Sequence, residues 1–165
     1  MELHDLLRES LVGLLRELVE GPPGDVAFVL NPGDAGILRS LDRLSASEAS
    51  ARPNGRSSVA AHVQHLRYGF ELLNRWARGE DPFADADWSK SWGLQQVNDE
   101  EWRELREALG REARAWMTAV TERATWDPVT LGGSIGSAAH LAYHLGAIRQ
   151  LVPAASGPPS EGGSV

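Results

Sequence analysis

The sequence contains no cysteine, and this absence restricts the chemistry that the chain can perform. It can form neither a disulfide nor a thiolate ligand, so a metal ion would have to be held by imidazole, carboxylate or water. A cysteine nucleophile is excluded too, and thiol chemistry would need a thiol supplied by a substrate or cosubstrate. The five histidines therefore become the residues to place.

The sequence also lacks long apolar runs and an excess of basic residues. No segment approaches the roughly 20 apolar residues of a membrane span, and the first residues, MELHDLLRESL, are amphipathic rather than basic and then apolar. The net charge is −7, whereas nucleic-acid binding needs a basic surface that displaces counterions. We therefore expect a cytoplasmic protein that binds neither membranes nor nucleic acid.

The composition is that of one globular domain. Of the 165 residues, 42% are hydrophobic and 24% are charged, a balance typical of folded proteins. The length suits a single domain, and no alternating pattern is long enough to build a sheet. The sequence predicts one all-α domain over residues 1–153 and a disordered Gly/Pro/Ser-rich tail over residues 154–165.

Apolar residues recur every three or four positions in four segments, which is the spacing of amphipathic helices. The first segment covers residues 3–20. The second follows a serine cap at Ser57 or Ser58 and ends at Gly79, a typical C-cap residue. A short helix over Ala35–Leu44 is expected between them.

The last two helices are bounded by further caps. The third should begin at Asn98 or Asp99 and run to about Arg123. The fourth should follow a Gly132-Gly133 turn, with Ser134 as its cap, and should end before Pro153. The crossover before the third helix carries Phe83, Trp88 and Trp92, which should pack against the helices. Together these segments predict a four-helix bundle.

His140 and His144 are four positions apart in the fourth helix, so their side chains lie about 40° apart on one face. Leu141, Leu145 and Ile148 lie beside this face and direct it inward. Two such histidines are more often hydrogen-bonded core residues than ligands. A third inward histidine would favour a metal site, because three protein ligands leave an open coordination position.

The second helix offers His62 and His65, and the apolar pattern alone does not choose between them. However, Ser58-Val59 is followed by His65-Leu66, seven positions after the serine, and the last helix reads His140-Leu-Ala-Tyr-His144-Leu-Gly-Ala-Ile-Arg-Gln150. These motifs resemble those of the DinB/YfiT-like family. The resemblance spans about residues 3 to 152, and the two histidine-bearing helices are its specific part.

The resemblance implies a four-helix bundle with a variant connection order and a divalent metal ion, zinc, nickel or iron, held by His65, His140 and His144. His62 is then assigned a hydrogen-bonded structural role, and His4 is expected to be solvated. The chain departs from the family pattern at Ala61, where relatives often have glutamate.

Three neutral imidazoles would leave a divalent ion positively charged and able to acidify a bound water or thiol. Some members of the family are transferases that use low-molecular-weight thiols, and the resemblance implies a metal-bound thiolate that attacks a small electrophile. Oxygen chemistry at iron would require a carboxylate ligand, for which Asp99, Glu100 or Glu101 remain alternatives.

The leading interpretation is a metal-dependent transferase or hydrolase that acts on a small molecule. The alternative is a non-catalytic interaction module stabilised by its metal ion, and a homodimer is compatible with both. Candidates for the wall of a substrate site are Arg67, Tyr68, Asn74, Trp88, Trp92, Tyr143 and Arg149.

Overall fold

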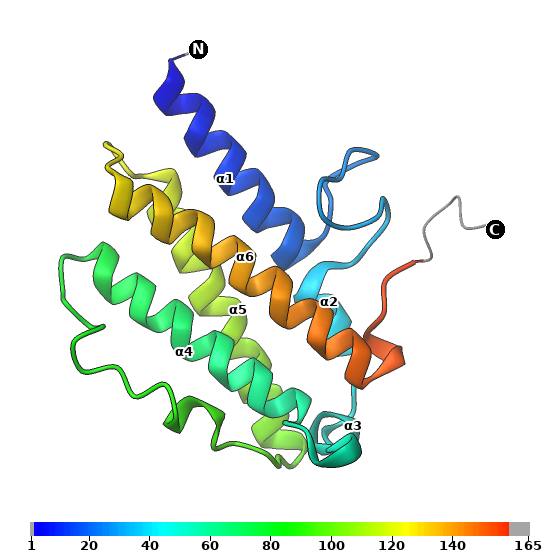
Figure 1. Cartoon of the computed structure of the whole chain (residues 1–165). Coiled ribbons are helices and arrows are strands. Elements are labelled where there is room, and N and C mark those ends of the chain that lie inside the picture. Colours follow the sequence, from blue (N-terminus) through cyan, green and yellow to red (C-terminus); the bar gives the residue numbers. More distant parts are fainter. Residues whose placement is uncertain (1, 159–165) are drawn as a thin grey trace.

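The computed structural model describes residues 2–158 and shows an all-helical fold over this range (Figure 1). The predicted all-α class is confirmed, since the described residues contain helices and no strands. The long helices are α1 (Leu3–Glu20), α4 (Val59–Ala77), α5 (Asp99–Thr121) and α6 (Pro128–Leu151). The short elements are α2 (Gly36–Asp42), α3 (Ala46–Ser50) and the 3-10 turns η1 (Pro53–Gly55), η2 (Lys90–Trp92) and η3 (Pro153–Ala155).

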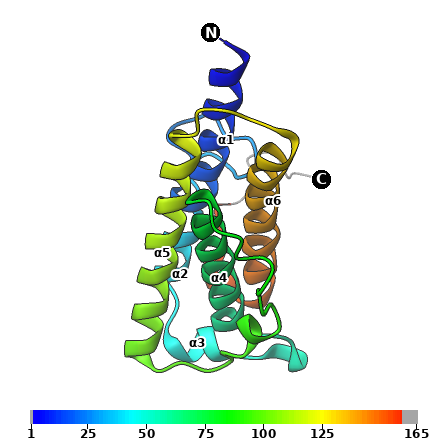
Figure 2. The same ribbon diagram turned by 90° about the vertical axis from the view of Figure 1, so that its left-hand side faces the viewer.

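The four long helices lie side by side around a common core (Figures 1 and 2). Helix α5 packs against α1 and α4, and α6 packs against the same two helices, while α2 and α3 lie against α5. The core side chains include Leu15, Ile37, Leu66, Trp116 and Leu141, which are all at most 1% exposed. None of the helices in the described residues combines the length and the apolar character that a membrane span needs.

Local capping explains where the first three long helices begin or end. Helix α1 stops at Gly21, whose φ of 97° is in the left-handed region and whose Cβ, if present, would lie 2.3 Å from a backbone oxygen. The hydroxyl of Ser58 accepts the N–H of Ala61 at the start of α4. Asn98 caps α5 and forms a capping box with Glu101. These starts agree with the sequence pattern.

Helix α6 begins about two turns earlier than the sequence pattern predicts, so the expected Gly132-Gly133 turn is wrong. Asp127 is the true cap, accepting the N–H groups of Val129 and Thr130 at 2.8 and 3.1 Å, and Pro128 occupies the first helical position. A Cβ on Gly133 would lie 3.0 Å from the ring of Trp76. Gly133 therefore serves close packing inside a helix, and the glycine pair does not end one.

Two further details depart from the sequence interpretation. Helix α3, which is capped by a Ser45 and Glu48 capping box, is not predicted. The disordered tail was expected from Ala154, but Ala155 is fully buried in η3, and the guanidinium of Arg43 donates to the carbonyl of Ser156. Residues 159–165, the rest of that tail, lie outside the described residues.

The crossover between α4 and α5 lies along α4, as predicted (Figure 2). Phe83 packs edge-on against Trp76, and Trp88 packs edge-on against Tyr68. The hydroxyl of Tyr68 also accepts the N–H of Asp87 at 3.0 Å. These contacts hold the crossover over the middle of α4, where His65 lies.

Candidate metal centre

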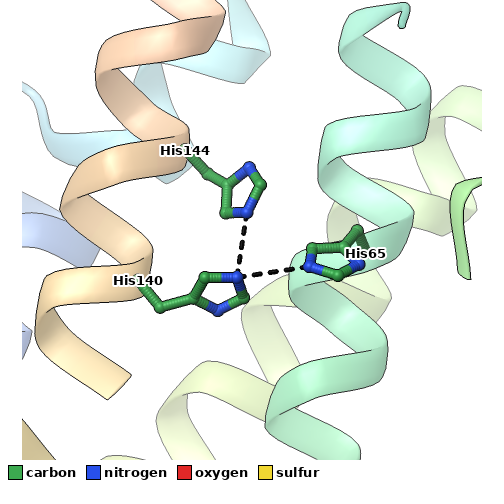
Figure 3. Close-up of side chains that lie close together, drawn as sticks. All are labelled: His65, His140 and His144. Carbon is green, nitrogen blue, oxygen red and sulfur yellow. Dashed lines mark hydrogen bonds between the residues drawn. The ribbon is translucent and has the colours of Figure 1, made fainter. Parts of the chain in front are cut away.

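Three histidines from two helices converge on one point (Figure 3). His65 comes from α4, and His140 and His144 come from successive turns of α6. The Nε2 atom of His140 lies 3.2 Å from that of His65 and 2.9 Å from that of His144. A tetrahedral ion with bonds of about 2.1 Å separates its ligand atoms by about 3.4 Å. Only small movements would be needed, so these histidines could hold a metal ion.

The cluster is closed on one side and open on the other. His144 is 1% exposed and His65 is 7% exposed, whereas His140 is partly exposed. His65 and His140 also line a pocket of about 460 Å³ between α4, α6 and the crossover. Two of the three imidazoles can therefore be reached by a small molecule.

A serine hydroxyl determines which nitrogen of His65 carries the proton. Ser91 donates its single hydroxyl proton to the carbonyl of Trp88 at 2.6 Å, and its oxygen lies 2.7 Å from Nδ1 of His65. Nδ1 must therefore be the donor in the second hydrogen bond. A neutral His65 then has its lone pair on Nε2, the nitrogen that faces His140. Metal-binding histidines are commonly oriented in this way by a partner of the other nitrogen.

Burial keeps these imidazoles uncharged. It lowers the pKa of His65 to about 4 and that of His144 to about 3, and neighbouring imidazoles add to both shifts. Burial also lowers the pKa of His62 and of His140. At neutral pH each ring is therefore a neutral imidazole with a single N–H proton. Metal coordination requires this state.

His62 contacts the cluster from outside. Its Nδ1 lies 2.8 Å from Nδ1 of His144, on the opposite side of that ring from Nε2. Its ring also meets Trp92 edge-on at a centroid distance of 5.1 Å. His62 therefore has the hydrogen-bonded role that was predicted for it, and it orients His144 much as Ser91 orients His65.

The crossover supplies a wall over the histidines. The ring of Trp92 stacks on His65 with centroids 4.3 Å apart, and Trp88 packs against the same imidazole at 5.5 Å. Both tryptophans are candidates from the sequence. Ser91 is not, because it lies 26 positions after His65 in a turn-rich segment, and no spacing rule connects them.

The other candidates for a substrate wall have different surroundings in the structure. Asn74 donates to the backbone and side chain of Glu112 and thereby joins α4 to α5. Tyr143 contacts the ring of His144 edge-on but is 70% exposed. Three candidates remain, and they form polar contacts away from the histidine nitrogens: Arg67, Tyr68 and Arg149.

The structure corrects the expectation for His4 and does not support the alternative carboxylate ligands. His4 is half-buried instead of solvated, because the α5–α6 connection places Trp126 against it at a ring distance of 6.1 Å. The acidic residues at the start of α5, Asp99, Glu100 and Glu101, are exposed and do not belong to the histidine cluster. Their carboxylates neutralise the end of a helix and pair with neighbouring groups.

The fold and the site thus define an all-helical protein with a buried cluster of three histidines that could hold a metal ion. Comparison of the chain with protein-family models, curated proteins and solved structures gave no match. The case for a function therefore depends on the residues themselves.

Proposed function

We propose that this chain is a DinB-like metalloprotein in which His65, His140 and His144 hold one divalent ion, with zinc, nickel and iron as the candidates. In this proposal the four long helices correspond to the bundle of that family. The ion supplies Lewis-acid chemistry for a transferase or hydrolase that acts on a small molecule, with a low-molecular-weight thiol as the expected cosubstrate.

The observation that supports the proposal best is the convergence of three Nε2 atoms with no carboxylate among them. Nitrogen lone pairs that point at one another repel unless a proton or a cation lies between them. The pKa values of His65 and His144 are strongly lowered, so additional protons bind there poorly. A divalent cation fits the same position and needs neutral imidazoles.

The surroundings favour an enzyme over an interaction module. A purely structural ion would have four protein ligands and no access. Here three histidines form the cluster, and a pocket reaches two of them. The residues of the chain would therefore bind and orient a substrate beside the ion, while Trp88 and Trp92 would limit the entry of water.

The first test is metal analysis of protein purified without a histidine tag, followed by titration with zinc. We expect one tightly bound equivalent in the wild type. His65→Ala, His140→Ala and His144→Ala should each weaken zinc binding by more than about 100-fold, since even the loss of an outer-shell partner costs 10- to 100-fold. His4→Ala is the matched control, because His4 lies against Trp126, and it should bind zinc like the wild type.

The second test separates the two classes of function. A chelator should lower the melting temperature of the loaded wild type, because the ligands join two helices that are distant in sequence, and it should leave His144→Ala unaffected. The metal-free protein should remain folded, because its core is independent of the histidines. A screen of thiol cosubstrates against simple electrophiles then tests catalysis. Tight zinc binding by all three alanine variants would refute the ligand set.

A further inference from the structure

The pocket beside the histidines is built from three elements and is strongly asymmetric in its chemistry. At one end it reaches the imidazoles of His65 and His140. Apart from Ser137, the remaining lining is aromatic, aliphatic or glycine, with Phe70 from α4 and Phe83 and Trp88 from the crossover. Phe83 and Trp88 are 42% and 40% exposed, so the crossover is the solvent-facing wall of the pocket.

Apart from the imidazoles of His65 and His140, no acidic or basic side chain lines this pocket among the described residues. The hydroxyl of Ser137, which also lines it, is already used: it accepts from the indole N–H of Trp116 at 2.8 Å and donates to the carbonyl of Ser134 at 2.7 Å. A charged ligand group in the apolar part would lose its hydration without gaining a counterion. The strong acceptor positions are confined to the histidine end.

We propose that this pocket binds the uncharged, apolar body of a small ligand, of the size of a substituted benzene ring, with the ligand's donor atom directed to the end formed by His65 and His140. The placement of the donor atom rests on the proposed function. The preference for an uncharged apolar body does not, because it follows from the lining alone.

Two glycines of α6 provide a matched pair of variants. Gly136 lines the pocket, and a Cβ added there would meet nothing within 4 Å. Gly132, one turn earlier on the same helix, also has nothing within 4 Å but does not line the pocket. Both positions are exposed and helical. Gly136→Leu should therefore fill the pocket, while Gly132→Leu adds the same side chain outside it.

The experiment is a fluorine NMR titration of the metal-free protein with three probes of similar size: para-fluorotoluene, para-fluorobenzoate and para-fluorobenzylamine. The uncharged probe should bind at least about tenfold more tightly than either charged probe, because an unpaired buried charge costs more than 1.4 kcal/mol. Gly136→Leu should weaken its binding about tenfold or more, and Gly132→Leu should leave it unchanged. Equal binding of charged and uncharged probes, or equal effects of the two leucines, would overturn the proposal.

A second variant guards against misfolding of Gly136→Leu, which circular dichroism would reveal. The methyl group of Gly69→Ala would meet Trp88 and His140 at 3.8 and 3.9 Å, which are ordinary contact distances. This variant should fold normally and should also weaken binding of para-fluorotoluene, whereas unchanged binding would count against the pocket.

A zinc-loaded arm with benzyl mercaptan and the anionic thiol mercaptoacetate distinguishes failure of this inference from failure of the proposed function. If zinc is not retained but the metal-free protein prefers para-fluorotoluene, the proposed function fails and the apolar pocket stands. If zinc is retained but mercaptoacetate binds as tightly as benzyl mercaptan, the apolar preference fails and the metal site stands.

Discussion

Two buried polar regions of this molecule differ in the groups that their polar atoms contact. Near the end of α1, the carboxylate of Glu17 accepts the N–H groups of Phe28, Val29 and Leu30 at 2.6 to 3.1 Å. In the histidine cluster, by contrast, three Nε2 atoms face one another, and no carboxylate from residues 2–158 joins the cluster.

A second buried carboxylate, that of Asp34, also has hydrogen-bonding partners. Arg149 from α6 donates to the buried carboxylate of Asp34 at 2.7 Å, and the same oxygen accepts the N–H of Gly36 at 2.9 Å. A buried carboxylate paired with a cation holds a structure together. Three neutral imidazoles that meet at their Nε2 atoms can exchange the protons between them for a metal ion, so such a cluster indicates a candidate binding site. The comparison therefore separates structural polar groups from functional ones.

Breaking the ion pair between Arg149 and Asp34 should have the largest effect on folding. Arg149→Met leaves the Asp34 carboxylate buried without its cation, and we expect the free energy of unfolding to fall by about 3 kcal/mol. Zinc affinity should change little. Urea denaturation measures the first quantity, and zinc titration of the folded variant measures the second.

Arg67→Met is the control for that variant, because Arg67 pairs with Glu71 on the surface of α4 and should contribute less than about 1 kcal/mol. Equal losses in the two variants would mean that burial does not distinguish these ion pairs. A large loss of zinc affinity in Arg149→Met would mean that the two polar regions are coupled.

Acidification should act on the histidine cluster. The pKa values of His65 and His144 are lowered in the folded protein, to about 4 and about 3, whereas the unfolded chain titrates near 6.5. Between these values the unfolded state binds more protons, so stability falls as the pH falls through 6.5. In the metal-free protein, the free energy of unfolding should decrease by about 2 kcal/mol between about pH 7.5 and about pH 5.8, about 1 kcal/mol from each of the two histidines.

About half of that decrease should disappear in His144→Ala, because this change removes one of the two rings whose pKa is strongly lowered. Urea denaturation of both proteins at the two pH values, with a chelator present, measures the difference. If His144→Ala loses as much stability as the wild type on acidification, the histidines do not cause the pH dependence.

Removal of Ser91 should have the smallest effect and tests the tautomer argument directly. Ser91→Ala removes the acceptor that holds the proton on Nδ1 of His65, and zinc affinity should fall about tenfold. Ser89→Ala is the matched control, since the Ser89 hydroxyl bonds to the exposed Asp87 and lies outside the cluster. Zinc titration measures both. An unchanged affinity in Ser91→Ala would show that the hydrogen bond does not prepare His65 for a metal ion.

Much of the fold could be predicted from local patterns. The bounds of α1 and the starts of α4 and α5 follow from apolar spacing and from single capping residues such as Ser58 and Asn98, because a cap bonds to backbone groups only two or three positions away. The start of α6 could not be predicted as reliably from the sequence, since a Gly-Gly pair is typical of a turn. The glycine at position 133 is explained by Trp76 of α4, whose ring would lie 3.0 Å from a Cβ there.

The candidate site divides in the same way. The spacing of His140 and His144 is enough to place both on one face of a helix, because it equals about one helical turn, and the composition is enough to exclude thiolate ligands. The packing of the helices is needed to show that the Nε2 of His65 faces this pair while His62 bonds to the far nitrogen of His144. It is also needed to show that Ser91 orients His65. Helical periodicity sets which side chains share a face, whereas the packing of α4, α6 and the crossover sets which atoms on different elements meet.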